Sequence, residues 1–210
     1  MIRTSIAITL ALLVPAAMAS GCKKKEDGGG ATKTAEPTGG AAPAAKPAKT
    51  ITINEADWVV KNLKDVSPMI NVSMKVPKDA KLEKNGNGGV DVQINDVYQL
   101  TVSQLAVSNI AEAMTSDKSL TIGHSSYING KVVTEEPTGM VYTMQMKDEA
   151  NGIKYQPEFH FAHYLEKDGA IYSVQDAKPL SSPLDTPGST YSEALAKQVY
   201  GIVKGSAKVN

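Results

Sequence analysis

The sequence predicts an α+β domain, in which a mostly antiparallel sheet of six or seven strands is covered by a mid-chain helix and a C-terminal helix. Short segments in which apolar and polar residues alternate recur between turn sequences, and two other segments place apolar residues at helical spacing. A chain of 210 residues with a hydrophobic fraction of 41% suits one soluble domain plus appendages. We expect this single globular domain to occupy residues 51–210.

Residues 1–21 predict a signal peptide. A positive start at Arg3 precedes an apolar stretch from Ile6 to Ala17, and small residues follow. The apolar stretch is shorter than the roughly 20 residues that cross a bilayer, and Pro15 interrupts it. We therefore expect a removable export signal rather than a membrane-spanning helix.

Residues 19 to 22 read ASGC, which resembles the lipobox of bacterial lipoproteins. The resemblance implies that a diacylglyceryl group is attached to the sulfur of Cys22, that cleavage occurs just before it, and that the new amino terminus is acylated. Lipoproteins favour leucine where this chain has Ala19. Residues 17–19 also fit an A-x-A cleavage site, so a soluble secreted product beginning at Ser20 is the alternative.

The thiol of Cys22 is the only one in the chain, so an intramolecular disulfide is impossible. Without acylation it would be an unpaired thiol in an oxidising compartment. Acylation explains why it stands alone, and several acyl chains on one residue would give a stable anchor.

Residues 22–50 predict the lipidated cysteine followed by a disordered tether rich in Lys, Gly, Ala and Pro. Residues 23–50 contain no Leu, Ile, Val or aromatic residue, so they cannot form a core. As a flexible coil they would reach roughly 30 Å. Sorting habits of bacterial lipoproteins imply an outer-membrane location, because Lys23 stands where inner-membrane retention commonly uses Asp. The domain would then lie in the periplasm or at the cell surface.

The first elements of the domain are a helix and a strand. Asn54 is a candidate cap for a short amphipathic helix through Leu63, with Trp58 available to face the core. The alternating apolar residues from Ile70 to Val76 then predict a half-buried strand that ends at Pro77.

A hairpin or meander and a helix follow. Residues 85–89 (NGNGG) predict a turn before apolar alternation over residues 90–94 and 98–102. Asn109 with Glu112 predicts the capped start of the mid-chain helix.

Four further strands and the last helix complete the pattern. The strands are expected over residues 127–134, 140–147, 156–165 and 170–175. A capping box from Thr190 to Glu193 predicts the start of the C-terminal helix, and Gly205 predicts its end. The expected apolar stripe of this helix consists of Tyr191, Leu195, Val199, Ile202 and Val203.

The order of strands, helix, strands and last helix resembles that of the Mog1/PsbP-like family of α/β/α sandwiches. The resemblance is topological and covers most of residues 66–206. Because that family includes non-enzymatic binding and assembly factors, it implies a binding module.

The distribution of charge argues against a nucleic-acid partner. Residues 51–210 carry 15 Lys against 19 acidic residues, whereas residues 23–50 carry six Lys against three acids. An acidic domain lacks the positive surface that phosphate binding requires. Arg3 is the only arginine, so the mature chain has no guanidinium group for bidentate contacts with phosphate or carboxylate.

Two patterns suggest metal ligands. His160 and His163 are three residues apart on an expected strand, so their side chains point to opposite faces and do not converge on one ion. Met140, Tyr142, Met144 and Met146 share one face of their strand, where thioethers suit Cu(I). Methionine at such positions is more often part of a core. We therefore assign no metal, cofactor or catalytic residue.

Three other features suggest chemistry but have simpler interpretations. His124 with Ser125 and Ser126 lacks the flanking glycines of a nucleophile elbow. Glu135 and Glu136 resemble an acid/base pair but enter a turn. The NGNGG sequence lacks both the Lys-Ser/Thr of a phosphate loop and the carboxylates of a calcium loop.

The sequence therefore favours a membrane-anchored envelope lipoprotein that is not an enzyme and binds a protein or another envelope component. A small-molecule or metal-binding lipoprotein is the alternative. A hydrolase is a third hypothesis, which requires one of the three histidines to meet a serine and an acid.

Overall fold

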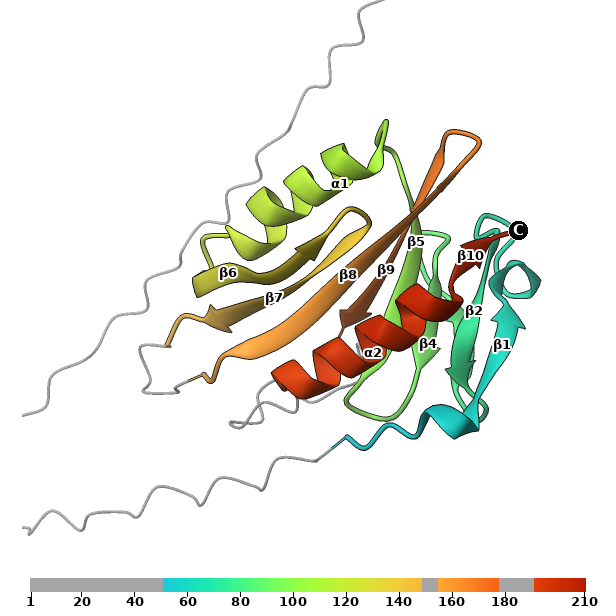
Figure 1. Cartoon of the computed structure of the whole chain (residues 1–210), viewed down its shortest axis with the longest axis horizontal. Coiled ribbons are helices and arrows are strands. Elements are labelled where there is room, and N and C mark those ends of the chain that lie inside the picture. Colours follow the sequence, from blue (N-terminus) through green and yellow to red (C-terminus); the bar gives the residue numbers. More distant parts are fainter. Residues whose placement is uncertain (1–50, 149–154, 178–190) are drawn as a thin grey trace, which may run out of the picture. The chain divides into compact units, whose positions relative to one another are not determined.

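A seven-stranded antiparallel sheet forms the centre of the fold (Figure 1). The computed structural model describes residues 51–148, 155–177 and 191–210. The strand order is β3-β4-β5-β9-β8-β7-β6. The strands are β3 (Lys81–Lys84), β4 (Val90–Gln93), β5 (Gln99–Leu105), β6 (Tyr127–Glu136), β7 (Gly139–Met146), β8 (Glu158–Lys167) and β9 (Ala170–Ala177).

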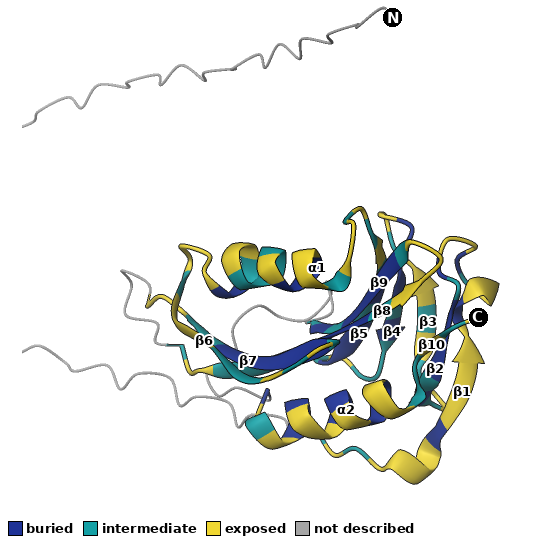
Figure 2. Cartoon of the chain, turned by 45° about the horizontal axis from the view of Figure 1, so that its top comes forward, coloured by how far each residue is buried: buried dark blue, intermediate teal, exposed yellow. Residues whose placement is uncertain are grey.

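Helices cover both faces of this sheet (Figure 2). On one face α1 (Ile110–Asp117) continues into a π-helical turn, η3 (Lys118–Ile122), and packs on β7 and β8. On the other face lies α2 (Glu193–Ser206), which buries Leu195, Val199 and Val203 against the sheet. No helix in the three described ranges is long and apolar enough to cross a bilayer.

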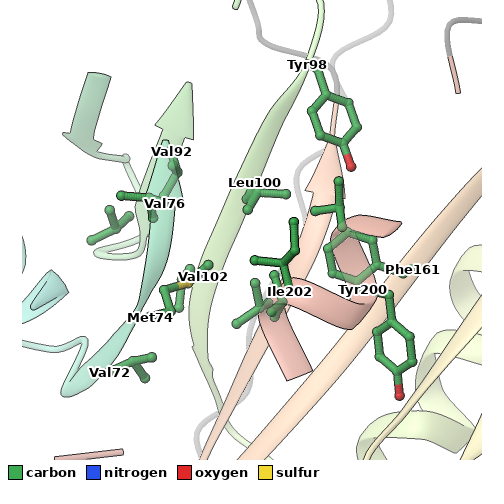
Figure 3. Close-up of a cluster of buried hydrophobic side chains, with 14 of the residues drawn as sticks. Val72, Met74, Val76, Val92, Tyr98, Leu100, Val102, Phe161, Tyr200 and Ile202 are labelled. Carbon is green, nitrogen blue, oxygen red and sulfur yellow. The ribbon is translucent and has the colours of Figure 1, made fainter. Parts of the chain in front are cut away.

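A second, three-stranded sheet packs beside α2 on the same face. It has the order β1-β2-β10 and consists of β1 (Trp58–Asn62), β2 (Val72–Pro77) and β10 (Lys208–Val209). The alternating residues of β2 place Met74 and Val76 in the main core. Figure 3 shows these two side chains facing Val92, Leu100 and Val102 of the large sheet.

The predicted fold class is confirmed, and most predicted elements are present. Seven strands are expected between residues 70 and 175. They correspond to β2, β4, β5, β6, β7, β8 and β9. The side chain of Asn109 accepts a hydrogen bond from the backbone N–H of Glu112 (2.9 Å), as the predicted cap requires. Strands β3 and β10 were not predicted.

The helix predicted from Asn54 to Leu63 is wrong. The side chain of Asn54 does cap a turn, but this is a single 3₁₀ turn, η1 (Glu55–Asp57), and β1 follows directly. The β-branched pair Val59 and Val60 favours a strand, and this strand pairs along its whole length with β2. A second 3₁₀ turn, η2 (Leu63–Asp65), ends it.

The boundaries of α2 also differ from the prediction. Its cap is Ser192, whose hydroxyl accepts from the backbone N–H of Leu195 (3.2 Å). Tyr191 therefore lies before the helix, and Gly205 lies inside its last turn. Thr190, Cys22 and the segments predicted as signal peptide and tether lie outside the described residues.

Candidate functional site

Strands β8 and β9 separate before they end. Their pairing runs from Lys167 opposite Ala170 to Ala162 opposite Gln175 and stops there. Beyond that point β8 continues to pair with β7, and β9 continues to pair with β5. A gap between two central strands leaves backbone groups that other partners must satisfy.

The side chains of Asp176 and His160 occupy this gap. Oδ1 of Asp176 accepts from the backbone N–H of Phe161 (3.1 Å), which takes the place of a missing ladder bond. The same oxygen lies 3.2 Å from Nδ1 of His160. The other oxygen, Oδ2, accepts from the hydroxyl of Tyr98 at 3.4 Å. One carboxylate thus joins three segments of the chain.

Tyr191 closes the gap from the side of α2. Its carbonyl oxygen accepts from the backbone N–H of Phe159 (2.8 Å), and its ring lies 4.8 Å from the ring of His160. Its hydroxyl reaches the carbonyl oxygens of Val97 (3.0 Å) and Ala177 (2.9 Å). Tyr191 therefore ties the start of α2 to the edges of the separated strands.

The side chains of the cluster are buried together. The side chains of His160 and Asp176 are 6% and 1% exposed, and that of Glu158, whose Oε2 lies 3.5 Å from Nε2 of His160, is 22% exposed. The ring of Tyr142 stacks on His160 at 5.7 Å. We name His160, Asp176, Glu158, Tyr98 and Tyr191 the gap cluster.

The electrostatics of the gap cluster favour a protonated imidazole. Burial lowers the pKa of His160, but the charge of Asp176 and the contacts with Asp176 and Glu158 outweigh it and raise this pKa to about 9. With the ring protonated, Nδ1–H donates to Asp176 and Nε2–H faces Glu158. Burial, together with the charge of Asp176, raises the pKa of Tyr98 well above its ordinary value.

The raised pKa of His160 predicts that the protein loses stability as the pH rises from about 6.5 to about 9. In this window the folded chain keeps a proton that the unfolded chain, with a histidine pKa of about 6.5, releases. The free energy of unfolding should fall by at most about 1.4 kcal/mol per pH unit. Urea unfolding of the full-length chain at closely spaced pH values measures this slope.

His160→Gln and His163→Gln form a matched pair of variants for this measurement. Burial lowers the pKa of His163, so its titration affects stability only as the pH falls below about 6.5. His160→Gln should flatten the slope above pH 6.5, while His163→Gln should keep it. An equal slope in both variants would mean that another group carries it.

His160 and His163 lie in different surroundings, as their spacing of three residues on a strand predicts. The ring of His163 lies edge-on to Tyr200 of α2, 5.9 Å away, whereas His160 lies in the gap cluster. Nδ1 of His163 is buried without a hydrogen-bond partner in the described part of the chain. No three His, Cys, Asp or Glu side chains of the described residues are placed to hold a metal ion.

The methionine stripe forms part of the core beneath α1. Met140 is fully buried and Tyr142 nearly so, in a cluster with Ala113 and Met114 of the helix. Met146, at the end of the strand, is 39% exposed. The core interpretation of these residues therefore accounts for the stripe.

The remaining candidate residues contact neighbouring backbone or side-chain groups and form no catalytic arrangement in the described part of the chain. Nδ1 of the exposed His124 accepts from the backbone N–H of Ser126 (3.2 Å). Glu135 pairs with Lys118 (2.6 Å), and Glu136 pairs with Lys204 and accepts from the hydroxyl of Tyr200. None of the histidines in the described ranges is hydrogen-bonded to a serine hydroxyl.

The NGNGG sequence is a turn, as predicted. The side-chain oxygen of Asn85 accepts from the backbone N–H groups of Asn87 (3.1 Å) and Gly89 (2.9 Å). Gly88 has a φ of +82°, which favours glycine, and its carbonyl oxygen accepts from the hydroxyl of Ser67. The side-chain oxygen of Asn85 and the carbonyl of Gly88 are therefore already hydrogen-bonded.

A groove of about 300 Å³ lies apart from the gap cluster, between α2 and β2. Its charged side chains are paired, Lys75 with Glu55 (3.0 Å) and Lys197 with Glu193 (2.6 Å). Gly201 and Gly205 form part of its wall. The groove contains no histidine and does not reach His160.

The gap cluster arranges a carboxylate behind an imidazole, which is how proteins orient a catalytic or metal-binding histidine. Here, however, the far nitrogen faces the carboxylate of Glu158 rather than a nucleophile. The cluster can therefore hold a buried positive charge between two acids and fix the separated strands. Comparisons with protein-family models, curated proteins and solved structures find no match.

Proposed function

We propose that this chain is an envelope lipoprotein, anchored through Cys22, whose domain binds another envelope component and catalyses no reaction. The observation that supports the binding role best is the closure of the gap cluster. His160 and Asp176 are the described residues most like a catalytic pair, and both are almost completely buried beneath Tyr191. Among the described residues these two side chains are shielded from solvent, which favours a role for the outer surface of the domain.

The proposed lipid anchor is argued from the sequence around Cys22. We also propose that the domain is related to the Mog1/PsbP-like family, whose order of strands and helices it resembles. Both faces of the large sheet are occupied, by α1 on one side and by α2 with the small sheet on the other. In its described ranges such a domain offers strand edges and helix surfaces. These features suit contacts with a macromolecule.

Cross-linking in intact cells tests the binding role. We expect the full-length chain to form a specific cross-linked product with an envelope protein. The matched control keeps residues 1–50 but carries an unrelated soluble domain in place of residues 51–210, and it should lose that product. Identical products from both chains, or none from either, would contradict the proposal.

A small-molecule or metal-binding role is the second candidate, because Nε2 of the buried His160 makes no hydrogen bond within the described residues. The carboxylate oxygen Oε2 of Glu158 lies 3.5 Å from it. This role requires that Zn(II), Cu(I) or a metabolite raise the unfolding temperature of the full-length chain. The rise must also disappear in His160→Gln.

A further inference from the structure

The four strand edges of the two sheets differ in how well they are protected. On the large sheet, β3 carries Lys81, Glu83 and Lys84, and β6 contains two register shifts and a positive φ at Asn129. On the small sheet, β10 has two residues, and the carbonyl oxygen of Asn210 beside it accepts from the side chain of Lys167 (2.8 Å). Charges, bulges and short strands are the usual means of blocking further strand pairing.

The edge formed by β1 has less protection. It is five residues long and regular, and its central residue, Val60, is 62% exposed. Figure 1 shows β1 as the outer strand of the small sheet, and Figure 2 shows it exposed along most of its length. An exposed regular edge with apolar side chains is a template for another strand.

The hydrogen-bonding phase of β1 identifies the groups that face outward. The backbone N–H of Lys78 donates to the carbonyl of Asp57 (2.8 Å), and this pair continues the register of β1 with β2. Bonded pairs alternate along an antiparallel ladder, so Val59 and Lys61 bond to β2. Val60, like Trp58 and Asn62, then points its backbone groups away from β2.

Two observations on β2 support this assignment. Pro77, opposite Trp58, has no N–H to donate. The N–H of Lys75, opposite Val60, donates instead to the hydroxyl of Ser206 in α2 (3.1 Å). At β1 itself the N–H of Trp58 bonds to the carbonyl of Glu55, which leaves the Trp58 carbonyl and both groups of Val60 facing outward.

The charges nearest to β1 differ between its two ends. Glu55 and Asp57 precede the strand, whereas Lys61 and Lys64 lie in its second half and just after it; all four are exposed, as is Asp65, which follows Lys64. An antiparallel second copy of this segment would place the lysines of one copy beside the acids of the other. A parallel copy would oppose like charges, which is unfavourable.

We propose that β1 pairs with β1 of a second copy of this chain, antiparallel and with Val60 on the two-fold axis. In this register the two Val60 residues exchange both backbone hydrogen bonds, and the carbonyl of Trp58 accepts from the N–H of Asn62 in the second copy. Lys61 of one copy lies opposite Val59 and diagonal to Asp57 of the other. The result is one continuous six-stranded sheet across two protomers.

Sedimentation equilibrium of the full-length chain in a non-ionic detergent tests this interface. We expect a reversible dimer, weak because a five-residue strand buries little surface. Val60→Pro should abolish it, because the lost N–H is not used in the ladder with β2 and the fold can survive. Val60→Thr is the matched control and should still form the dimer. A wild-type chain that stays monomeric at sub-millimolar concentration overturns the proposal.

A charge exchange identifies the second copy as the partner. Asp57→Lys alone and Lys61→Glu alone each place like charges across the interface and should each weaken the dimer about tenfold. An equal mixture of the two variants should restore it, because each lysine then meets an acid. Dimerisation that the mixture does not restore, or that Val60→Pro leaves unchanged, would contradict the proposal.

Discussion

Replacing Asp176 with alanine is expected to lower the free energy of unfolding by about 3–5 kcal/mol, the cost of leaving one member of a buried ion pair without its partner. The carboxylate accepts from His160, from the backbone N–H of Phe161 and from Tyr98. Without it the imidazole must lose its proton in the core, and the N–H of Phe161 loses its partner.

Asp176→Asn separates the charge from the hydrogen bonds. The amide oxygen can still accept from the N–H of Phe161, so this variant should be less destabilised than Asp176→Ala. Both variants should also lose the pH dependence above pH 6.5, because His160 no longer has its principal counter-charge.

Urea unfolding of the full-length chain near neutral pH measures these differences. The matched control is Glu83→Ala, which removes an exposed carboxylate paired with Lys81 at 2.7 Å. The control should change stability by less than about 1 kcal/mol. Equal effects of Asp176→Ala and Glu83→Ala would show that the gap cluster does not stabilise the fold.

Replacing Cys22 with alanine is expected to move the chain from the membrane fraction to the soluble fraction. Each buried methylene of an acyl chain contributes about 0.8 kcal/mol to membrane binding, and Cys22 is the only residue that can carry a thioether-linked lipid. The change should be nearly complete, because the proposed anchor has no second attachment.

Ser20→Ala is the matched control for the fractionation, because it changes a neighbouring small residue and keeps the cysteine. This variant should stay with the membrane. Cys22→Ala chains that also stay with the membrane, after a high-salt wash that removes electrostatic contacts of Lys23 to Lys25, would contradict a lipid anchor.

Most of the large sheet could be predicted from the sequence, because alternation and turn residues are local signals. The turn at Gly88 has a positive φ, which glycine favours, and it lies where the sequence predicts a turn. Gly169, also at positive φ, lies between the strands expected over residues 156–165 and 170–175. Met140, Tyr142 and Met144 share one face of β7, as their periodicity predicts, and the structure places this face against α1.

The sequence predicts β2, but the other two strands of the small sheet, β1 and β10, could not be predicted because the signals that define them are distant in the sequence. Asn54 is a genuine cap, but only pairing with β2 decides that Trp58 begins a strand instead of a helix. β10 consists of Lys208 and Val209, which carry no strand pattern of their own. Tertiary pairing outweighs local propensity in both cases.

The gap cluster was missed, although one signal was present. Tyr172 and Val174 alternate on the buried face of β9, and Asp176 continues that alternation with a charged residue. A carboxylate at a core position requires a buried partner. The sequence does not indicate that His160 is this partner, because the gap between β8 and β9 arises from the pairing of four strands.

Intact mass of the mature protein tests the lipid anchor at Cys22 directly. We expect a chain that begins at Cys22 and carries the added mass of a diacylglyceryl group and an N-terminal acyl chain. A chain that begins at Ser20, with an unmodified thiol and no added lipid mass, would contradict it.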